Sequence, residues 1–188
     1  APELVRRVRS LMGAEFSTLY GQTEHCPVIT QHHRQDAIDD ICNTAGQPVA
    51  QTEVSIRSVE GNHAVTIGTV GEICARGPCV MLEYNDDPKA TSETVDTDGW
   101  LHTGDLGRMD ARGYISITGR VKEMIIRGGE NHFPAEIENC LLEHAEVAEV
   151  AVVGLPDSKW GEVIGAFIRS TGVLDKGALY AHCRANMS

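Results

Sequence analysis

A change of pattern at Gly119 constrains the fold more than any other feature of this 188-residue sequence. Residues 46–119 consist of short alternating segments separated by turn signals, a pattern that is typical of β-strands. Residues 120–188 instead predict a strand, a helix, two strands and a final helix. That order favours a compact α+β unit. We therefore expect a β-rich part that ends near Gly119 and a smaller α+β part after it.

Several elements are expected before Gly119. Residues 3–12 predict a helix, because their apolar side chains recur at helical spacing. These side chains are Leu4, Val5, Val8, Leu11 and Met12. Residues 85–95 predict a short helix with Asp87 as its cap and Pro88 at its first position. Strands are expected over residues 15–21, 52–59, 69–77 and 114–119. The sequences "DTDG" at 96–99 and "DARG" at 110–113 predict turns.

After Gly119, residues 123–127 predict a short strand that runs into a Gly-Gly loop. A helix should begin at Pro134, with Glu136 and Glu138 in its first turn, where the helix dipole favours anions. Its apolar face is expected to consist of Ile137, Leu141 and Ala145. Strands are predicted over residues 147–157 and 161–170, and a last helix over residues 175–187.

The composition limits the partners and the compartment. A net charge of −11 and a pI near 5.1 argue against nucleic acid or an anionic membrane as a general partner. No apolar run approaches the ~18 residues of a membrane span, and no signal peptide is visible. The six cysteines form no C-x-x-C pair and no zinc-finger spacing. We therefore expect buried, unpaired thiols in a reducing compartment, the cytoplasm. They are Cys26, Cys42, Cys74, Cys79, Cys140 and Cys183.

Four segments carry the residues that suggest chemistry. They are "LYGQTEH" at 19–25, "GWLHTGDLG" at 99–107, "GRVKEMI" at 119–125 and "RGGENHFPAEIE" at 127–138. Each has a purely structural explanation when taken alone: a strand exit, a capped turn, a solvated basic patch or a flexible loop. Their functional groups are nevertheless complementary, and this favours a common ligand.

The complementary groups match one magnesium nucleotide. Tyr20 offers a flat face for a purine, and Asp105 offers two acceptor oxygens for a ribose diol. Thr23 offers a hydroxyl, and Glu24 a hard oxygen ligand, which suits a phosphate with bound Mg²⁺. Arg120 adds a rigid guanidinium fork for hydroxyls or phosphate.

Taken in this order, the four segments resemble the motifs of the adenylate-forming superfamily, which includes acyl-CoA synthetases, peptide-synthetase adenylation domains and luciferases. The stretch "VAVVGLPDSKWGE" at 150–162 matches as well. Peptide-synthetase domains usually carry a sequence such as "RGYRIELGEIE" where this chain has "RGGENHFPAEIE". The chain is therefore more similar to the acyl-CoA synthetase branch.

The resemblance implies a fold class that mixes α/β and α+β. Residues 1–119 would be the β-rich, C-terminal part of a large nucleotide-binding domain. Residues 120–122 would form a hinge, and residues 123–188 an incomplete, mobile small α+β domain. Relatives carry a Ser/Thr/Gly-rich phosphate loop upstream of Tyr20 and a catalytic lysine that would lie beyond Ser188. We thus expect a missing N-terminal portion of the same parent chain, and no activity from these 188 residues alone.

The resemblance also implies individual roles. Nucleotide contacts would come from Tyr20, Gly21, Thr23, Asp105 and Arg120, with Glu24 holding Mg²⁺. Thr23, Glu24 and Arg120 would also assist catalysis. Lys122 falls at the hinge. The pantetheine tunnel for CoA would be lined by Gly128, Gly129 and Glu130, and the acyl group would be near His25, Cys26 and Pro27. Trp160 and Gly161 are expected to pack the small domain.

The implied function is that of an AMP-forming acyl-CoA synthetase for a fatty acid or another carboxylate. Its substrates would be ATP, the carboxylic acid and CoA, and its products acyl-CoA, AMP and pyrophosphate. Two alternatives remain open at this point. One is an adenylating enzyme that loads a carrier-protein thiol, and the other is an inactive chain that only binds a nucleotide or a partner.

Overall fold

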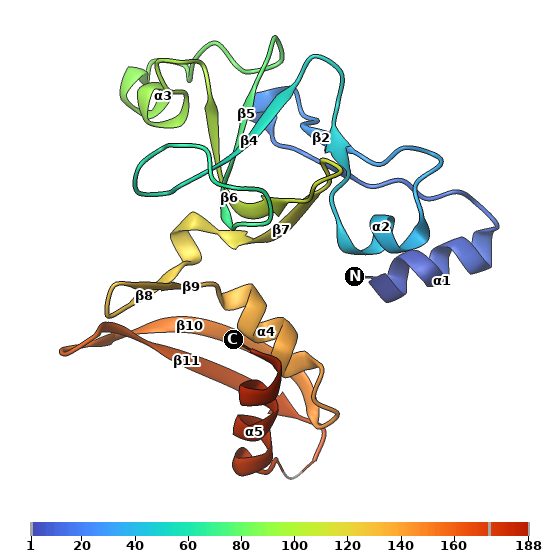
Figure 1. Cartoon of the computed structure of the whole chain (residues 1–188), viewed down its shortest axis with the longest axis vertical. Coiled ribbons are helices and arrows are strands. Elements are labelled where there is room, and N and C mark those ends of the chain that lie inside the picture. The colour runs from blue at the N-terminus through green and yellow to red at the C-terminus, as the bar shows by residue number, and fades with distance from the viewer. Residues whose placement is uncertain (1, 173, 188) are drawn as a thin grey trace. The chain divides into compact units, whose positions relative to one another are not determined.

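The computed structural model describes residues 2–172 and 174–187 (Figure 1). The chain divides into two compact units, a first unit of residues 1–117 and a second unit of residues 118–188. Each unit has its own buried apolar cluster. The first cluster is centred on Ile56, Ile73 and Ile115, and the second on Ile125, Leu141 and Val152. None of the helices in the described part of the chain has the length and apolar character that a bilayer span requires.

The first unit contains two antiparallel sheets. The smaller sheet has the order β1 (Leu19–Tyr20), β2 (Thr30–Gln31), β3 (Gln47–Pro48). The larger has the order β4 (Glu53–Arg57), β5 (Gly71–Arg76), β6 (Leu101–Met109), β7 (Ile115–Arg120), and β7 continues past residue 117. Its helices are α1 (Pro2–Met12), α2 (Ile38–Asn43) and α3 (Pro88–Thr94), with a short 3₁₀ turn η1 (Thr23–His25).

Local sequence signals explain much of the first unit. The strands predicted at 52–59, 69–77 and 114–119 are confirmed as β4, β5 and β7. The predicted cap of α3 is also confirmed, since the Asp87 Oδ1 atom accepts a hydrogen bond from the Ala90 N–H at 2.9 Å. In the turn at 96–99, the Asp96 Oδ1 atom accepts from the N–H groups of Asp98 and Trp100, so a side chain replaces the missing backbone acceptor.

Other predictions for the first unit were wrong or incomplete. The strand expected over residues 15–21 is reduced to the two residues of β1. The prediction omitted α2 and did not name the nine-residue strand β6, whose polar residues and glycines hide the alternation of a strand. Helix α1 forms as predicted, but its apolar stripe is mostly exposed in this chain. Val5 is buried, whereas Leu4, Leu11 and Met12 are exposed.

The second unit is a four-stranded sheet with two helices on one face (Figure 1). Its strand order is β10 (Val147–Asp157), β11 (Gly161–Ser170), β8 (Ile125–Arg127), β9 (Glu130–His132). The helices are α4 (Pro134–Leu142) and α5 (Lys176–Asn186), and a 3₁₀ turn η2 (Val121–Glu123) precedes β8. The predicted element order is confirmed, except that β9 was taken for part of a loop.

One prediction about α4 was wrong. The helix ends at Leu142, so Ala145 lies outside it and is exposed. Ile137 and Leu141 do belong to the apolar cluster of the second unit. Glu138 faces the sheet instead of solvent, since its Oε1 atom accepts a hydrogen bond from the Val152 N–H at 2.8 Å.

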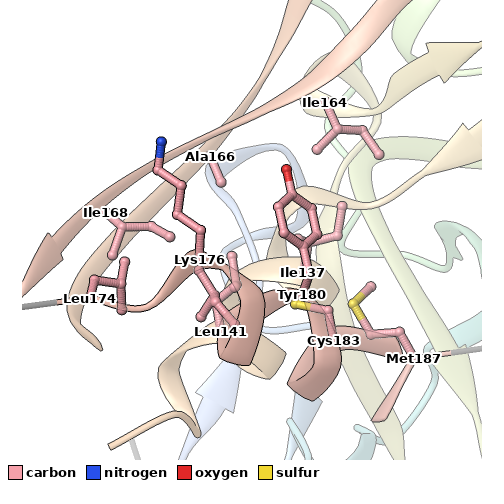
Figure 2. A pocket seen from close by; sticks show the side chains of 11 residues that line it. Ile137, Leu141, Ile164, Ala166, Ile168, Leu174, Lys176, Tyr180, Cys183 and Met187 are labelled. Carbon is pink, nitrogen blue, oxygen red and sulfur yellow. The ribbon is translucent and has the colours of Figure 1, made fainter. Parts of the chain in front are cut away.

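A pocket of about 630 Å³ lies among α4, α5 and β11 (Figure 2). Its walls are mainly apolar and include Ile137, Leu141, Ile164 and Ile168, with Tyr180 and Lys176 as polar members. None of the residues predicted to bind nucleotide, Mg²⁺ or CoA lines it. The volume of a pocket is therefore a poor guide to the candidate site in this chain.

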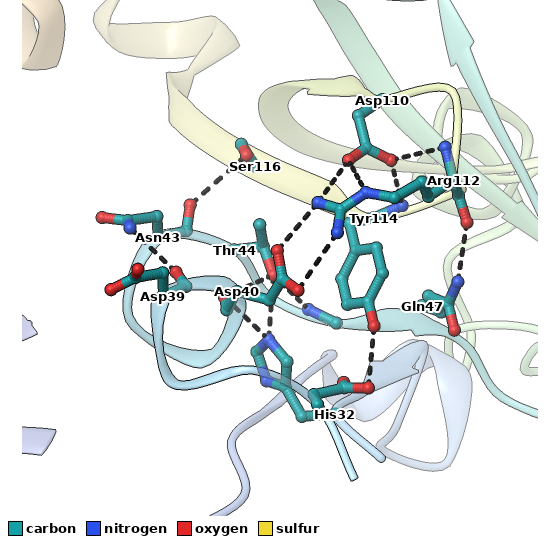
Figure 3. Close-up of polar contacts among 12 residues, drawn as sticks. His32, Asp39, Asp40, Asn43, Thr44, Gln47, Asp110, Arg112, Tyr114 and Ser116 are labelled. Atoms are coloured by element: carbon teal, nitrogen blue, oxygen red, sulfur yellow. Dashed lines mark hydrogen bonds and ion pairs between the residues drawn. The ribbon is translucent and has the colours of Figure 1, made fainter.

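A polar network anchors α2 to the turn before β7 in the first unit (Figure 3). The Arg112 guanidinium donates to both carboxylate oxygens of Asp40, at 3.1 and 2.8 Å, and also to Asp110 Oδ2. The predicted turn at 110–113 is confirmed, because Asp110 Oδ1 accepts from the N–H groups of Arg112 and Tyr114. The Tyr114 hydroxyl donates to Asp36 Oδ1 at 2.7 Å, which raises the pKa of Tyr114 to about 12.

Replacing Tyr114 with Phe should test this network. A hydrogen bond to a charged group contributes about 1.5–3 kcal/mol, so Tyr114→Phe should lower the free energy of unfolding by roughly that amount at neutral pH. The folded pKa is higher than the unfolded value. The contribution is therefore complete below pH ~10 and is lost as the pH rises toward about 12. Denaturant unfolding at pH 7 and at pH 9 should give the same difference in the free energy of unfolding between Tyr114→Phe and the parent chain.

Tyr180→Phe is the matched control, because Tyr180 is 69% exposed. It should leave the stability unchanged within ~0.5 kcal/mol. Equal stability of Tyr114→Phe and the parent chain would show that the hydrogen bond from Tyr114 to Asp36 contributes nothing.

Candidate functional site

Two of the predicted nucleotide residues meet in the first unit. The Tyr20 hydroxyl, at the end of β1, donates a hydrogen bond to the Asp105 Oδ2 atom of β6 at 2.9 Å. Asp105 is only 8% exposed, and Tyr20 packs against the apolar cluster of Ile56, Ile73 and Ile115. The fold thus brings together an aromatic ring and a buried carboxylate that are 85 positions apart in the sequence. A carboxylate oriented in this way can accept hydrogen bonds from a diol.

The residues after Tyr20 form a tight connection. Gly21 lies directly against the backbone of Pro27, and a Cβ atom on Gly21 would be 1.8 Å from the Pro27 carbonyl oxygen. This contact requires glycine regardless of any ligand. Thr23 begins η1 with its side chain exposed, and Glu24 is half-buried in the same turn.

A residue that sequence analysis missed orients Glu24. The Tyr84 hydroxyl donates to Glu24 Oε1 at 2.8 Å, and this hydrogen bond raises the pKa of Tyr84. The Met81 N–H donates to the Glu24 carbonyl oxygen at 2.7 Å. Magnesium takes oxygen ligands and is often held by one or two carboxylates together with phosphates and waters. A fixed carboxylate beside an exposed threonine hydroxyl is chemically suited to that role.

The three residues considered for the acyl group differ in exposure. His25 is fully buried, and its Nδ1 atom lies 3.1 Å from the Val28 carbonyl oxygen. Cys26 and Pro27 are exposed. In this chain only the latter two present surface to a ligand, so the predicted acyl contact of His25 stays a prediction.

The remaining predicted residues lie in the second unit. Arg120 is the last residue of β7, and Lys122 lies in the 3₁₀ turn η2; both are exposed. A short turn between two strands is the kind of segment that can absorb a change in backbone angles. The hinge role of Lys122 and the nucleotide role of Arg120 remain predictions.

Gly128 and Gly129 form the two-residue turn of the hairpin between β8 and β9. Arg127 pairs with Glu130, and the two glycines have φ angles of +62° and +88°. Positive φ at both central positions is the requirement of a type I′ turn, which glycine meets without strain. The turn itself accounts for both glycines. The predicted tunnel role of Gly128, Gly129 and the exposed Glu130 is a separate matter and stays a prediction.

Trp160 and Gly161 pack against this hairpin. The Gly128 N–H donates to the Trp160 carbonyl oxygen at 2.8 Å, and Gly161 pairs with Arg127. The centroid of the indole ring lies 5.0 Å from the Arg127 guanidinium carbon and 4.6 Å from the Lys159 ammonium nitrogen. Their predicted packing role in the small domain agrees with these contacts.

Sequence analysis also missed a group of residues beside Asp105. Glu72 on β5 contacts His102 and Gly104 on β6, and its carboxylate oxygens lie 2.7 Å from His102 Nδ1 and 3.0 Å from the Gly104 N–H nitrogen. Ligand-type atoms of Glu72, Cys74 and His102 lie within 4.8 Å of one another. Burial, followed by the nearby Glu72 carboxylate, raises the pKa of the Cys74 thiol to about 12. The signal in the sequence was the "HTGD" segment, of which only Asp105 had been assigned.

Comparison with known proteins identifies the family. Residues 1–85 match the family model described as AMP-binding enzyme, and residues 136–188 match the AMP-binding enzyme C-terminal domain. The chain is 41% identical over 169 residues to the human medium-chain acyl-CoA ligase ACSF2, covering 89% of this chain and 28% of that protein. The chain belongs to the adenylate-forming superfamily, in its acyl-CoA synthetase branch.

Other relatives agree with this family. An indenyl-propanoyl:CoA ligase of Rhodococcus jostii is 46% identical, with 88% of this chain and 30% of that protein covered. ATP-bound MatB from Rhodopseudomonas palustris superposes with a TM-score of 0.87 and 27% identity, covering all of this chain and 37% of MatB. MenE from Bacillus subtilis, in complex with its acyl-adenylate intermediate, superposes with a TM-score of 0.82 and 33% identity, covering all of this chain and 38% of MenE.

The chain spans 27–31% of the length of the curated relatives it matches. The predicted family and fold class are confirmed by these comparisons, and both matched family regions lie in the expected order.

The hairpin glycines give a prediction for this family's small unit. A Cβ atom on Gly128 would lie 2.8 Å from Trp160 Cε3, whereas one on Gly129 would meet nothing within 4 Å. Both substitutions force a left-handed backbone on alanine at a cost of about 1–2 kcal/mol, but only Gly128→Ala adds a clash. Gly128→Ala should therefore destabilise the second unit more than Gly129→Ala. Thermal unfolding followed by Trp fluorescence would measure this, and an equal loss would show that the ring moves away at no cost.

Proposed function

We propose that this chain is part of an AMP-forming acyl-CoA synthetase. The enzyme would first join a carboxylate to ATP, giving an acyl-adenylate and pyrophosphate, and then transfer the acyl group to the thiol of CoA, releasing AMP. The observation that carries the proposal is the contact between Tyr20 and the buried Asp105 carboxylate, in a chain whose relatives are CoA ligases. An aromatic ring beside a diol acceptor supports the proposal, because adenosine offers a purine for stacking and a ribose diol for hydrogen bonding.

In the first half-reaction, the carboxylate oxygen attacks the α-phosphorus of ATP and pyrophosphate leaves. Asp105 would accept hydrogen bonds from the ribose hydroxyls, and Tyr20 would stack on the adenine. The hydrogen bond from Tyr20 does not prevent this, because it uses one acceptor position of Oδ2 and a carboxylate offers about four. Gly21, the residue after β1, would contact the nucleotide through its backbone, and Thr23 would donate its exposed hydroxyl to a phosphate.

The same half-reaction would require Mg²⁺, which neutralises charge on the phosphates when it is bound. Glu24 would hold the ion through its carboxylate, and the Tyr84 hydroxyl would fix the orientation of that carboxylate. Arg120 would assist at the ribose or phosphate from the border between the two domains. Electrostatic groups of this kind, aimed at developing charge, are usually the largest contribution to catalysis.

In the second half-reaction, the small domain would rotate about a hinge at residues 120–122, which includes Lys122, as in other hinge transitions. The hairpin with Gly128, Gly129 and Glu130 would then line the path of the pantetheine arm. We place the enzyme in the cytoplasm, because the buried cysteines Cys74 and Cys140 are free thiols, and a fatty acid is the first carboxylate class to test.

The acceptor can be tested directly. The relatives named as CoA ligases favour CoA over a carrier-protein thiol, but an amide bond synthetase, McbA from Marinactinospora thermotolerans, is also 32% identical with a TM-score of 0.82. An enzyme that carries this chain should be supplied with a panel of carboxylates, ATP and either CoA, a phosphopantetheinyl carrier protein or an amine. Acyl-CoA formation together with AMP would support the proposal. Pyrophosphate release without thioester formation on CoA would contradict it.

Asp105→Ala tests the nucleotide site. Hydrogen bonds to a charged group contribute about 1.5–3 kcal/mol, so this substitution should raise the KM for ATP about tenfold or more in the enzyme that carries this chain. The KM for the carboxylate should change little. Steady-state pyrophosphate release measures both constants. Tyr20→Phe keeps the ring and should cause a smaller rise. An unchanged KM for ATP would show that Asp105 has only a structural role as a buried carboxylate.

Gly129→Leu separates the two half-reactions. The backbone strain at φ +88° is common to Gly129→Ala and Gly129→Leu, and the space around the Cβ atom is open, so the two variants differ mainly in bulk. Gly129→Leu should leave carboxylate-dependent ATP–pyrophosphate exchange close to that of Gly129→Ala. It should slow acyl-CoA formation by a further ten- to hundredfold, equivalent to about 1.4–2.8 kcal/mol. Parallel losses of both half-reactions in the two variants would refute the tunnel role.

A further inference from the structure

We propose that Glu72, acting with His102, is a positioning residue for Asp105: it closes a backbone bulge in β6 that presents the Asp105 carboxylate to the ribose. This inference rests on the proposed nucleotide role of Asp105 and adds a residue from the neighbouring strand. Glu72 itself would touch neither the nucleotide nor the carboxylate substrate.

The bulge is visible in the register between β5 and β6. On β5, Glu72 pairs with Leu106, and Cys74 pairs with His102. These pairs are two residues apart on β5 but four residues apart on β6. Strand β6 therefore accommodates extra residues opposite Ile73, and Gly104 adopts a φ angle of +74° within them. Bulges of this kind re-aim a side chain, and here the re-aimed residue is Asp105.

Side chains replace the ladder hydrogen bonds that the bulge breaks. The Thr103 hydroxyl donates to the Ile73 carbonyl oxygen at 2.7 Å and accepts from the Asp105 N–H at 3.1 Å. Gly104 has no partner in the register between β5 and β6, and its N–H donates to Glu72 Oε1 at 3.0 Å. Glu72 is thus the side-chain acceptor, supplied from the adjacent strand, for the backbone that immediately precedes Asp105.

His102 fixes the carboxylate of Glu72. Its Nδ1 atom lies 2.7 Å from Glu72 Oε2, and its Nε2 atom lies 3.6 Å from Asp96 Oδ2. Asp96 is itself held by the turn that leads into β6, through the N–H groups of Asp98 and Trp100. The side chains of Glu72 and His102 are only 13% and 21% exposed. Loss of Glu72 would leave a Gly104 N–H without its acceptor in a half-buried position, and the bulge would relax.

The neighbouring Cys74 thiol raises the question of a metal ion, since it lies 3.6 Å from His102 Nδ1. Both oxygens of Glu72 already accept hydrogen bonds, from Gly104 and from His102. The cluster is therefore better described as a closed hydrogen-bonded brace than as a metal centre.

The experiment compares Glu72→Ala, Glu72→Gln, Asp105→Ala and the Glu72→Ala/Asp105→Ala double variant in the enzyme that carries this chain. Pyrophosphate release is measured with ATP and with 3′-deoxy-ATP, which lacks one ribose hydroxyl. Glu72→Ala should raise the KM for ATP about tenfold, with a smaller change in kcat, and should reduce the preference for ATP over 3′-deoxy-ATP to that of Asp105→Ala. Glu72→Gln keeps an acceptor for the Gly104 N–H and should preserve most of this preference.

A double-mutant cycle decides between positioning and an independent effect. Because Glu72 acts through Asp105, Glu72→Ala should add less than about twofold to the KM for ATP in the Asp105→Ala background. Glu53→Ala is the matched control, since it removes an exposed carboxylate from the neighbouring strand β4 and should leave the nucleotide preference unchanged. Glu72→Asp retains the charge but withdraws it by one methylene. Glu72→Asp replaces Glu72→Ala in the test if the alanine variant does not fold. It should show the same loss of preference for ATP over 3′-deoxy-ATP.

The outcomes are distinct. An unchanged preference for ATP over 3′-deoxy-ATP in the Glu72 variants, or additive losses in the cycle, would overturn the positioning role while Asp105→Ala still raises the KM for ATP. An Asp105→Ala variant with an unchanged KM for ATP would overturn the nucleotide role of Asp105 and, with it, this inference.

Discussion

The buried carboxylate of Asp105 sets the requirements for the structure around it. A charge removed from water is costly unless hydrogen-bond donors surround it, so a residue that is 8% exposed needs partners supplied by the fold. Tyr20 provides one such partner from a different sheet. This single contact requires β1 to lie beside β6 and requires Tyr20 to pack against the apolar cluster of the larger sheet. The segment that follows β1 contains two further close contacts: Gly21 lies against Pro27, and Tyr84 orients Glu24.

The sequence predicted best those features whose cause is local. The caps and turns made by Asp87, Asp96 and Asp110 depend on side chains that bond N–H groups two to four residues away, and all three formed as expected. Strand β6 could not be predicted in the same way, because its bulge is stabilised by Glu72 from another strand. The end of α4 was also misplaced, since the position of Ala145 depends on where the chain turns into β10 and not on helical spacing. The candidate site itself was found through its motifs. The residues that brace it, Tyr84 and Glu72, were missed because they lie far from those motifs in the sequence.

The Gly128-Gly129 pair shows why a local explanation and a functional one can coexist. A two-residue turn with two positive φ angles requires glycine whether or not a ligand approaches it. The same absence of side chains leaves the tip of the hairpin thin, and no atom lies within 4 Å of the place where a Cβ atom of Gly129 would be. Conformation therefore explains why the residues are glycines, and only the kinetics of the two half-reactions can reveal whether the open space beside Gly129 is used.

The four residues at 102–105 have separate tasks within one structural unit. His102 orients Glu72, Thr103 replaces a ladder bond to Ile73, Gly104 supplies the positive φ angle, and Asp105 carries the carboxylate. Of these four residues, Asp105 is the one that we propose to bind the ribose. The other three are needed because a regular strand directs its side chains alternately to the two faces of the sheet. In a regular strand, the direction of the carboxylate would therefore be set by the register of the whole sheet. A bulge lets one side chain point in a direction that this register does not set, but it leaves backbone N–H groups without partners in the neighbouring strand. Glu72 and Thr103 accept hydrogen bonds from those groups, so the brace and the carboxylate that we propose to bind ribose form one structural unit.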